Sequence, residues 1–329
     1  MDRRRFLLTS LVGALAAPLG AGAQQAGRIV RVGFLTVNGR ASATTKQNLD
    51  AFRQRLRELG WTEGVNIAIE SRYAEWRYDR LAGLAAELVK LPVDVIFANA
   101  APAAVAAKRA TPVIPIVFET LGEPIAVGLV ESLARPGGNV TGVSGLNPEL
   151  SGKRLEILKE VVPRLQQVVL LLNPSNVMAA PTLRETEKAA VLLNLKLHVA
   201  EVREPTEVDH AFAAIGADRA TAMIVMPDPM LLSQARRIQE LLLKYRLPSI
   251  HNETGWLQAG AFMIFGASLR DHFRQAASLV DKILRGARPG ELPVQQSTTF
   301  ELVINLKTAK ALGLTIPPSL LARAGRVIE

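Results

Sequence analysis

The chain has 329 residues, a formal net charge of +9 at pH 7 and no cysteine, and 49% of its residues are hydrophobic. A chain without cysteine relies on its core and not on disulfides, and a chain of this length usually divides into two domains. The basic residues are spread along the sequence and aromatic residues make up only 5% of it, which argues against a nucleic-acid-binding surface.

The N-terminus has the three parts of a secretory signal. Arginines at 3–5 form a basic head, a short apolar stretch follows at 6–17, and the Ala-Gly-Ala sequence at 21–23 suits signal peptidase. We therefore predict that residues 1–23 are a signal peptide, cleaved near Ala23, and that the mature chain is periplasmic. The arginine pair ahead of a Phe-Leu pair resembles a twin-arginine export signal; an arginine-rich Sec signal is the alternative.

After the signal, short apolar runs alternate with amphipathic stretches. The predicted strands of this first unit are 29–35, 65–69, 93–97, 114–118 and 140–143. The predicted helices are 49–59, 81–88, 102–108 and 124–133, the last because proline is favoured in the first turn of a helix. Regular alternation of strand and helix is typical of a parallel, doubly wound sheet.

The pattern then starts over and indicates a second unit of similar size. Its predicted helices are 150–161, 180–193, 206–215 and 230–245, and its predicted strands are 168–172, 195–199, 222–226 and 248–250. The last predicted elements are strand 261–265, helix 269–284, strand 300–304 and helix 306–312. They are too few for a third domain, so we interpret them as the chain crossing back to complete both units.

The predicted fold class is therefore α/β, with two doubly wound parallel-sheet lobes. We assign residues 24–145 plus 266–297 to lobe 1, and residues 146–265 plus 298–329 to lobe 2. Two such sheets facing each other across a hinge make a cleft that can close on a small molecule.

Several segments carry a resemblance: LRELGW (56–61), ETLGEP (119–124), LARPGGNVTG (133–142), LSGKRLE (150–156), MPDP (226–229) and FELVINLKTAK (300–310). They are similar to the ABC-type substrate-binding proteins that include the tryptophan-binding, TrpX-like group. The resemblance implies a type I periplasmic binding protein, whose lobes are joined by a three-crossover hinge. It also implies a monomer that delivers a small-molecule ligand to an inner-membrane ABC permease, with no enzymatic activity, cofactor, metal or nucleic acid.

Candidate ligand contacts lie where strands end, because open parallel sheets bind ligands beyond the C-terminal ends of their strands. The candidates are polar residues at these exits, Ala101 just before the predicted helix 102–108, and one aromatic residue as a wall of the cleft. They are Asn38, Asn99, Ala101, Glu119, Thr120 and Ser144 in lobe 1, and Asn173, Ser175, Asn176, Asp228, Asn252 and Phe265 in lobe 2.

Two acidic residues are candidates for binding an ammonium group. Asp228 is the first, because relatives that bind amino acids carry an acidic residue in this loop; alternatively, or in addition, it caps the following helix. Glu119 is the second, and could instead pair with an arginine.

Many relatives carry a hydroxyl residue where Ala100 or Ala101 stands, so the carboxylate of a ligand would be held differently here. The family suggests aromatic amino acids, and we expect an amphipathic solute with a carboxylate, an amino acid first.

The remaining motifs do not indicate catalysis. The four histidines form no metal-binding pattern, no P-loop is present, and the GVSG segment at 142–145 lacks the second glycine of a nucleophile elbow. We expect the histidines to be surface or capping residues. Trp76 and Tyr78 lie ahead of a helix and could reach the cleft, but we expect them to stack on the surface of their lobe. The alternative function is a periplasmic sensor that presents its solute to a membrane receptor.

Overall fold

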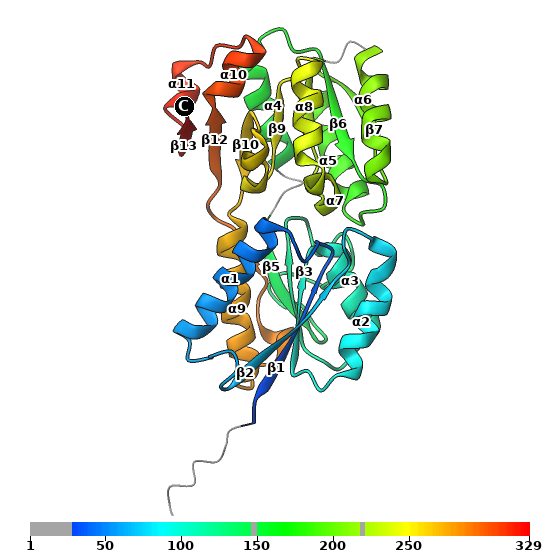
Figure 1. Ribbon diagram of the computed structural model, residues 1–329, viewed down its shortest axis with the longest axis vertical. Helices are drawn as coiled ribbons and strands as arrows, with labels where there is room; N and C mark the ends of the chain where they lie inside the picture. Colours follow the sequence, from blue (N-terminus) through cyan, green and yellow to red (C-terminus); the bar gives the residue numbers. More distant parts are fainter. Residues whose placement is uncertain (1–27, 146–149, 218–220) are drawn as a thin grey trace, which may run out of the picture.

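The computed structural model describes residues 28–145, 150–217 and 221–329, and the predicted signal peptide with its cleavage site near Ala23 lies outside them. Two lobes are stacked along the long axis of the molecule (Figure 1). Each is a mostly parallel sheet flanked by helices, which confirms the predicted α/β fold class. No helix in the described ranges is long and apolar enough to cross a membrane.

The sheet of lobe 1 has the strand order β2-β1-β3-β4-β5-β11 among the described residues. Its strands are β1 (Val30–Thr36), β2 (Ile67–Tyr73), β3 (Val95–Asn99), β4 (Ile116–Thr120), β5 (Val140–Ser144) and β11 (Gln295–Gln296), all paired in parallel. Helices α1 (Ala43–Glu58) and α9 (Leu269–Leu284) pack together on one face, and α2 (Leu81–Lys90) and α3 (Ala101–Ala110) on the other (Figure 1). Short 3-10 turns η1 (Tyr78–Arg80) and η4 (Pro289–Glu291) complete this lobe.

The sheet of lobe 2 has the order β7-β6-β8-β9-β10-β12-β13 in the part of the chain described. Its strands are β6 (Gln167–Leu172), β7 (Lys196–Glu201), β8 (Ala222–Val225), β9 (Ser249–His251), β10 (Met263–Gly266), β12 (Glu301–Asn305) and β13 (Arg326–Ile328), and β10 and β12 pair antiparallel. The helices are α4 (Leu150–Val161), α5 (Ala179–Leu192), α6 (Val208–Ala217), α7 (Pro229–Ser233), α8 (Ala235–Lys244), α10 (Leu306–Leu312) and α11 (Pro318–Leu321), with 3-10 turns η2 (Pro205–Glu207) and η3 (Thr254–Ala259).

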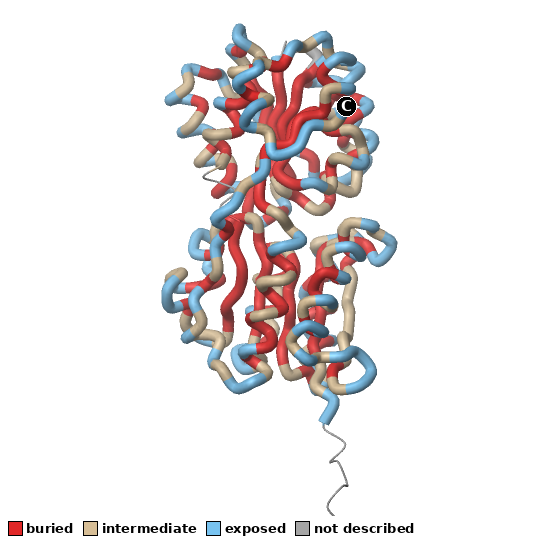
Figure 2. Tube along the Cα trace, turned by 90° about the vertical axis from the view of Figure 1, so that its left-hand side faces the viewer, coloured by how far each residue is buried: buried red, intermediate tan, exposed pale blue. Residues whose placement is uncertain are grey.

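The buried residues gather along the strands at the centre of each lobe (Figure 2). In lobe 1 the core holds a cluster of phenylalanines: Phe97 of β3 stacks on Phe52 of α1 with ring centroids 4.6 Å apart, and Phe273 of α9 meets Phe97 edge-on at 5.1 Å. Phe34 of β1 lies 5.4 Å from Phe97. These rings join both helices of this face to the sheet and thereby position the strand ends above them.

The chain passes between the two sheets between β5 and α4, between β10 and α9, and between β11 and β12. The second passage requires a glycine, because a Cβ on Gly266 would lie 1.8 Å from the carbonyl oxygen of Asn252. The last elements of the chain thus contribute to both lobes.

Two of the predicted helices are wrong. Residues 124–133 form successive turns, because Gly128 adopts φ +69° and Lys108 donates to the carbonyls of Gly128 and Leu129. The predicted helix 230–245 is two helices, α7 and α8, with Gln234 between them at non-helical angles.

Candidate functional site

One cavity lies between the lobes, at the ends of the strands where each sheet reverses its order. In lobe 1 the strand order is β2-β1-β3-β4-β5, so the reversal falls between β1 and β3. The corresponding strands of lobe 2 are β7-β6-β8-β9-β10, so there the reversal falls between β6 and β8. Described residues of both lobes line the cavity: Asn38, Thr44, Asn48, Asn99, Ala100, Ala101, Glu119, Thr120, Leu121, Gly122, Asn176, Met178, Thr182, Pro227, Asp228, Pro229, Leu232, Glu253 and Leu269. The set combines apolar side chains, amides and three carboxyl groups.

A row of polar side chains crosses three neighbouring strands at the lobe 1 side of the cavity. Thr36, Asn99 and Glu119 are register partners on β1, β3 and β4, so their side chains fall on the same face. The Thr36 hydroxyl donates to Asn99 Oδ1 at 2.8 Å, and Asn99 Nδ2 donates to Glu119 Oε2 at 2.6 Å. Asn38 Nδ2 also donates to Asn99 Oδ1, at 3.2 Å.

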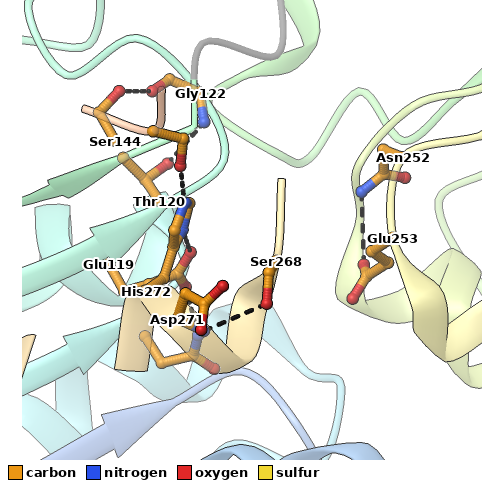
Figure 3. Close-up of polar contacts among 11 residues, drawn as sticks. Glu119, Thr120, Gly122, Ser144, Asn252, Glu253, Ser268, Asp271 and His272 are labelled. Carbon is orange, nitrogen blue, oxygen red and sulfur yellow. Dashed lines mark hydrogen bonds and ion pairs between the residues drawn. The ribbon is translucent and has the colours of Figure 1, made fainter. Parts of the chain in front are cut away.

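This row continues into the segments that cross between the lobes. His272 on the first turns of α9 lies with its Nδ1 3.0 Å from Glu119 Oε1, and its Nε2 contacts the Ser297 hydroxyl just after β11 (Figure 3).

His272 is buried, and so is His251, whose ring stacks on Trp256. The expectation of surface or capping histidines is therefore wrong for these two. Burial, and then the charge of Arg154, lowers the pKa of His251 to about 3.

Asp228 is the centre of the polar cluster in lobe 2. It caps α7 by accepting from the Leu231 N–H at 2.9 Å, and it also accepts from Asn176 Nδ2 at 2.9 Å and, more weakly, from Asn173 Nδ2 at 3.4 Å. Burial raises the pKa of Asp228, while these donors oppose the rise. The capping role that the sequence suggested is present in the structure.

The lobes contact each other at the cavity. The Tyr78 hydroxyl of lobe 1 donates to Asp228 Oδ2 of lobe 2 at 2.5 Å, and the Tyr78 side chain packs against the cores of both lobes. Tyr78 therefore packs on its own lobe and also reaches the cleft, which was the alternative for this residue. The Met178 side chain lies against Gly122: a Cβ on Gly122 would come within 2.1 Å of Met178 Cε. These contacts describe a closed arrangement of the lobes.

Glu253 supplies the third carboxyl group, from the segment between β9 and η3. It is 6% exposed, and within the described residues the hydrogen-bond partner of its side chain is Asn252 Nδ2 at 3.5 Å. Burial, followed by the negative charges of Glu119 and Asp228, raises the pKa of Glu253 to about 8. Figure 3 places Glu253 opposite Glu119. No lysine, arginine or histidine is among the described residues that line the cavity.

The loop before α3 carries backbone strain. Ala100 has φ +73° and ψ 147°, a conformation that favours glycine, and α3 has no side chain capping its N-terminus. Ala100 and Ala101 both line the cavity, so the uncapped N–H groups at this helix start are available to a ligand carboxylate.

The Ala100→Gly variant is expected to raise the free energy of unfolding by about 1 kcal/mol, because relief of strain exceeds the added entropy of the unfolded chain. Urea denaturation measures the change. Ala106→Gly, in the interior of the same helix, is the matched control and is expected to lose about 1 kcal/mol. An equal loss in both variants would mean that Ala100 is not strained.

The structure brings part of the sequence-derived candidates to the cavity. Asn38, Asn99, Ala101, Glu119, Thr120, Asn176 and Asp228 line it. The other five candidates do not line it. Ser144 donates to the Gly122 carbonyl, Asn173 donates to Asp228, and Asn252 donates to Glu253. The Phe265 carbonyl accepts from Arg154, and Ser175 lines a separate groove beside α2 and α3.

The sequence-derived candidates did not include two groups of residues at the site, one polar and one apolar. Glu253, Tyr78 and His272 carry its polar chemistry, and Met178, Leu121 and Leu232 supply apolar surface. Glu253 stands two residues after strand β9, so the rule that selected Asn252 could have selected it as well. Met178 meets Gly122, and Tyr78 meets Asp228, only in the closed arrangement of the lobes, for which the sequence has no local signal.

Two doubly wound lobes with a ligand cavity between their switch points define a type I periplasmic binding protein fold. The profile of the family described as "ABC transporter substrate binding protein" matches residues 41–328. The chain belongs to this family, which confirms the resemblance read from its segments. Members of the family bind solutes for ABC transporters.

Individual relatives agree with this. The chain is 28% identical over 264 residues to the tyrosine-binding protein of Clostridioides difficile, covering 80% of this chain and 75% of the relative. It superposes with a TM-score of 0.85 and 25% identity on the ABC domain from Streptococcus pneumonia in complex with L-Trp, covering 91% and 99% of the two chains. A conserved domain protein from Vibrio cholerae gives a TM-score of 0.86 and 27% identity, covering 91% and 100%.

Proposed function

We propose that this chain is the solute-binding component of an ABC importer and that it binds a small amphipathic amine, an amino acid first and an aromatic one in particular, between its lobes. The observation that carries this proposal is the cavity itself: carboxyl groups of both lobes face it, no described lining residue is cationic, and Leu121, Met178 and Leu232 add apolar surface. The start of α3 suits a ligand carboxylate. The relatives described as binding tyrosine and tryptophan support the same class.

The proposal includes the route and the partners of the protein. The chain would be exported by its signal peptide, of twin-arginine type, to the periplasm, act there as a monomer, close by hinge movement and release its solute unchanged to a permease. The lobe boundaries after residues 145, 265 and 297 belong to this proposal, since the passages between the sheets lie next to them. The membrane-receptor alternative has no comparable support, because the family is one of transporter components.

A thermal-shift screen of the chain from residue 24 onward tests the ligand class, because specific binding stabilises the folded state. The panel contains the amino acids, aromatic acids without an amine, sugars and nucleosides. A shift with tyrosine or tryptophan is expected, and chromatography of the released ligand is expected to return it unaltered. A shift with a sugar or nucleoside and none with any amino acid would overturn the proposed ligand class.

The Tyr78→Phe variant is expected to bind its ligand about 10- to 100-fold more weakly. The Tyr78–Asp228 hydrogen bond joins the two lobes in the closed arrangement, and a hydrogen bond to a charged group contributes about 1.5–3 kcal/mol. Isothermal titration calorimetry with the amino acid found in the screen measures the change. Tyr245→Phe, at the end of α8, is the control and should keep the parent affinity. Equal affinities of both variants would exclude a role of Tyr78 in closure.

A further inference from the structure

The three carboxyl groups at the cavity differ in how far the protein already satisfies them. Asp228 accepts from Tyr78, Asn176 and the Leu231 N–H, at 2.5, 2.9 and 2.9 Å. Glu119 lies 2.6 Å from its donor Asn99 Nδ2 and 3.0 Å from His272 Nδ1. Both carboxylates are thus held by donors on more than one element, and their first task is to tie those elements together.

Glu253 is different. It is the N-cap residue of η3, yet its side chain makes no capping hydrogen bond. The described residues offer it one hydrogen-bond donor, Asn252 Nδ2, at the long distance of 3.5 Å. The residue nevertheless is only 6% exposed and lines the cavity. A buried carboxyl group with this little support costs free energy, unless a cation from outside the chain completes its site.

We propose that Glu253, rather than Asp228, is the counter-ion that pairs with the ammonium group of the ligand. The inference rests on the proposed function, because it takes the cavity to be the binding site of an amine. This proposal places the recognition of the cationic nitrogen in lobe 2, at the start of η3. Glu119 and the start of α3, on the facing lobe, are left to contact the rest of the ligand.

The charges around Glu253 make ligand binding dependent on a proton. Burial and the facing carboxylates of Glu119 on β4 and Asp228 before α7 raise the pKa of Glu253 to about 8, and the Asn252 amide opposes the rise only weakly. His272 and Tyr78 face those two carboxylates and not Glu253. In the empty site at neutral pH Glu253 is therefore a carboxylic acid. When an ammonium group binds, the O–H proton leaves to solvent and a carboxylate–ammonium pair remains.

Isothermal titration calorimetry of the chain from residue 24 tests this coupling. The probes are L-tyrosine, L-tryptophan and the corresponding amines without a carboxylate, tyramine and tryptamine, each in two buffers of different ionisation enthalpy. Release of about one proton per bound ligand is expected at pH 6 to 7, falling towards zero at pH 9. Below pH 8 the affinity should rise by up to about tenfold per pH unit and then level off.

The Glu253→Gln variant is expected to bind these probes at least about tenfold more weakly and to release no proton. Glu123→Gln is the matched control, since Glu123 lies in the loop that supplies Leu121 and Gly122 but does not line the cavity. It should keep the parent affinity and proton release. If Glu253→Gln does not fold, as judged by circular dichroism, the proton release of the parent chain decides the matter alone.

The outcomes separate this inference from the proposed function. Binding of tyrosine or tryptophan without proton release, and with unchanged affinity in Glu253→Gln, overturns the role of Glu253 and leaves the amino-acid function standing. Binding of tyramine or tryptamine with proton release, but of neither amino acid, supports Glu253 and removes the amino-acid assignment. Binding of none of the four probes overturns the role of Glu253 towards aromatic amines and removes the aromatic assignment, while the thermal-shift screen decides on the other amino acids.

Discussion

Replacing Phe97 by alanine is expected to lower the free energy of unfolding by about 3–5 kcal/mol, the range for removal of a fully buried phenylalanine. Phe97 is inaccessible to solvent, stacks on Phe52 and meets Phe273 edge-on, so its loss leaves a void where two helices join the sheet. The void lies two residues before Asn99 and beside the turn of α9 that carries His272. The same change should therefore weaken ligand binding.

Urea denaturation followed by circular dichroism measures the loss of stability. Val113→Ala is the control, because Val113 is 78% exposed, and its effect is expected to stay within about 0.5 kcal/mol. A loss below about 1 kcal/mol in Phe97→Ala would contradict the assignment of this ring to the centre of the lobe 1 core.

The stability of the unliganded protein is expected to carry a pH-dependent contribution from Glu253. Its pKa rises from 4.5 to about 8 on folding, so between these values the folded chain binds a proton that the unfolded chain has lost. The contribution to stability is fully present below about pH 4.5 and is lost as pH rises towards 8. At pH 7 the cost is about 3 kcal/mol, as an order of magnitude.

The Glu253→Gln variant isolates this contribution, because glutamine resembles the neutral carboxylic acid in shape and does not ionise. Relative to the parent chain, the variant should gain stability steadily between pH 5 and pH 8. Urea denaturation of both proteins at several pH values, without ligand, measures the difference, with Glu123→Gln as the control for loss of a carboxylate. A difference that does not change with pH would show that Glu253 is ionised in the empty site.

The architecture could be derived from the sequence because it depends on patterns that repeat within short windows. Buried parallel strands need continuous apolar runs, and 95–98 and 168–172 have them; amphipathic helices need a repeat near 3.6 residues. The helix expected at 124–133 failed where Gly128 takes a positive φ and Lys108 binds the nearby carbonyls, a contact from another helix.

The candidate site could be derived only in part, for a related reason. Strand exits are local features, so Asn38, Asn99, Glu119 and Asp228 could be named. Whether a polar residue at such an exit faces the ligand or supports a neighbour depends on contacts between elements far apart in the chain. His272 meets Glu119 across 153 positions, and Tyr78 meets Asp228 across 150.

By itself the sequence determined the α/β class, the two-lobed plan and the family, because hydrophobic periodicity and short motifs are properties of neighbouring residues. The tertiary structure decided which carboxyl groups at the cavity are already satisfied and which one is left. Glu119 and Asp228 have donors from other strands and from the opposite lobe, whereas Glu253 is buried with one weak partner among the described residues. That difference arises from burial and from long-range hydrogen bonds, which exist only once the chain has folded.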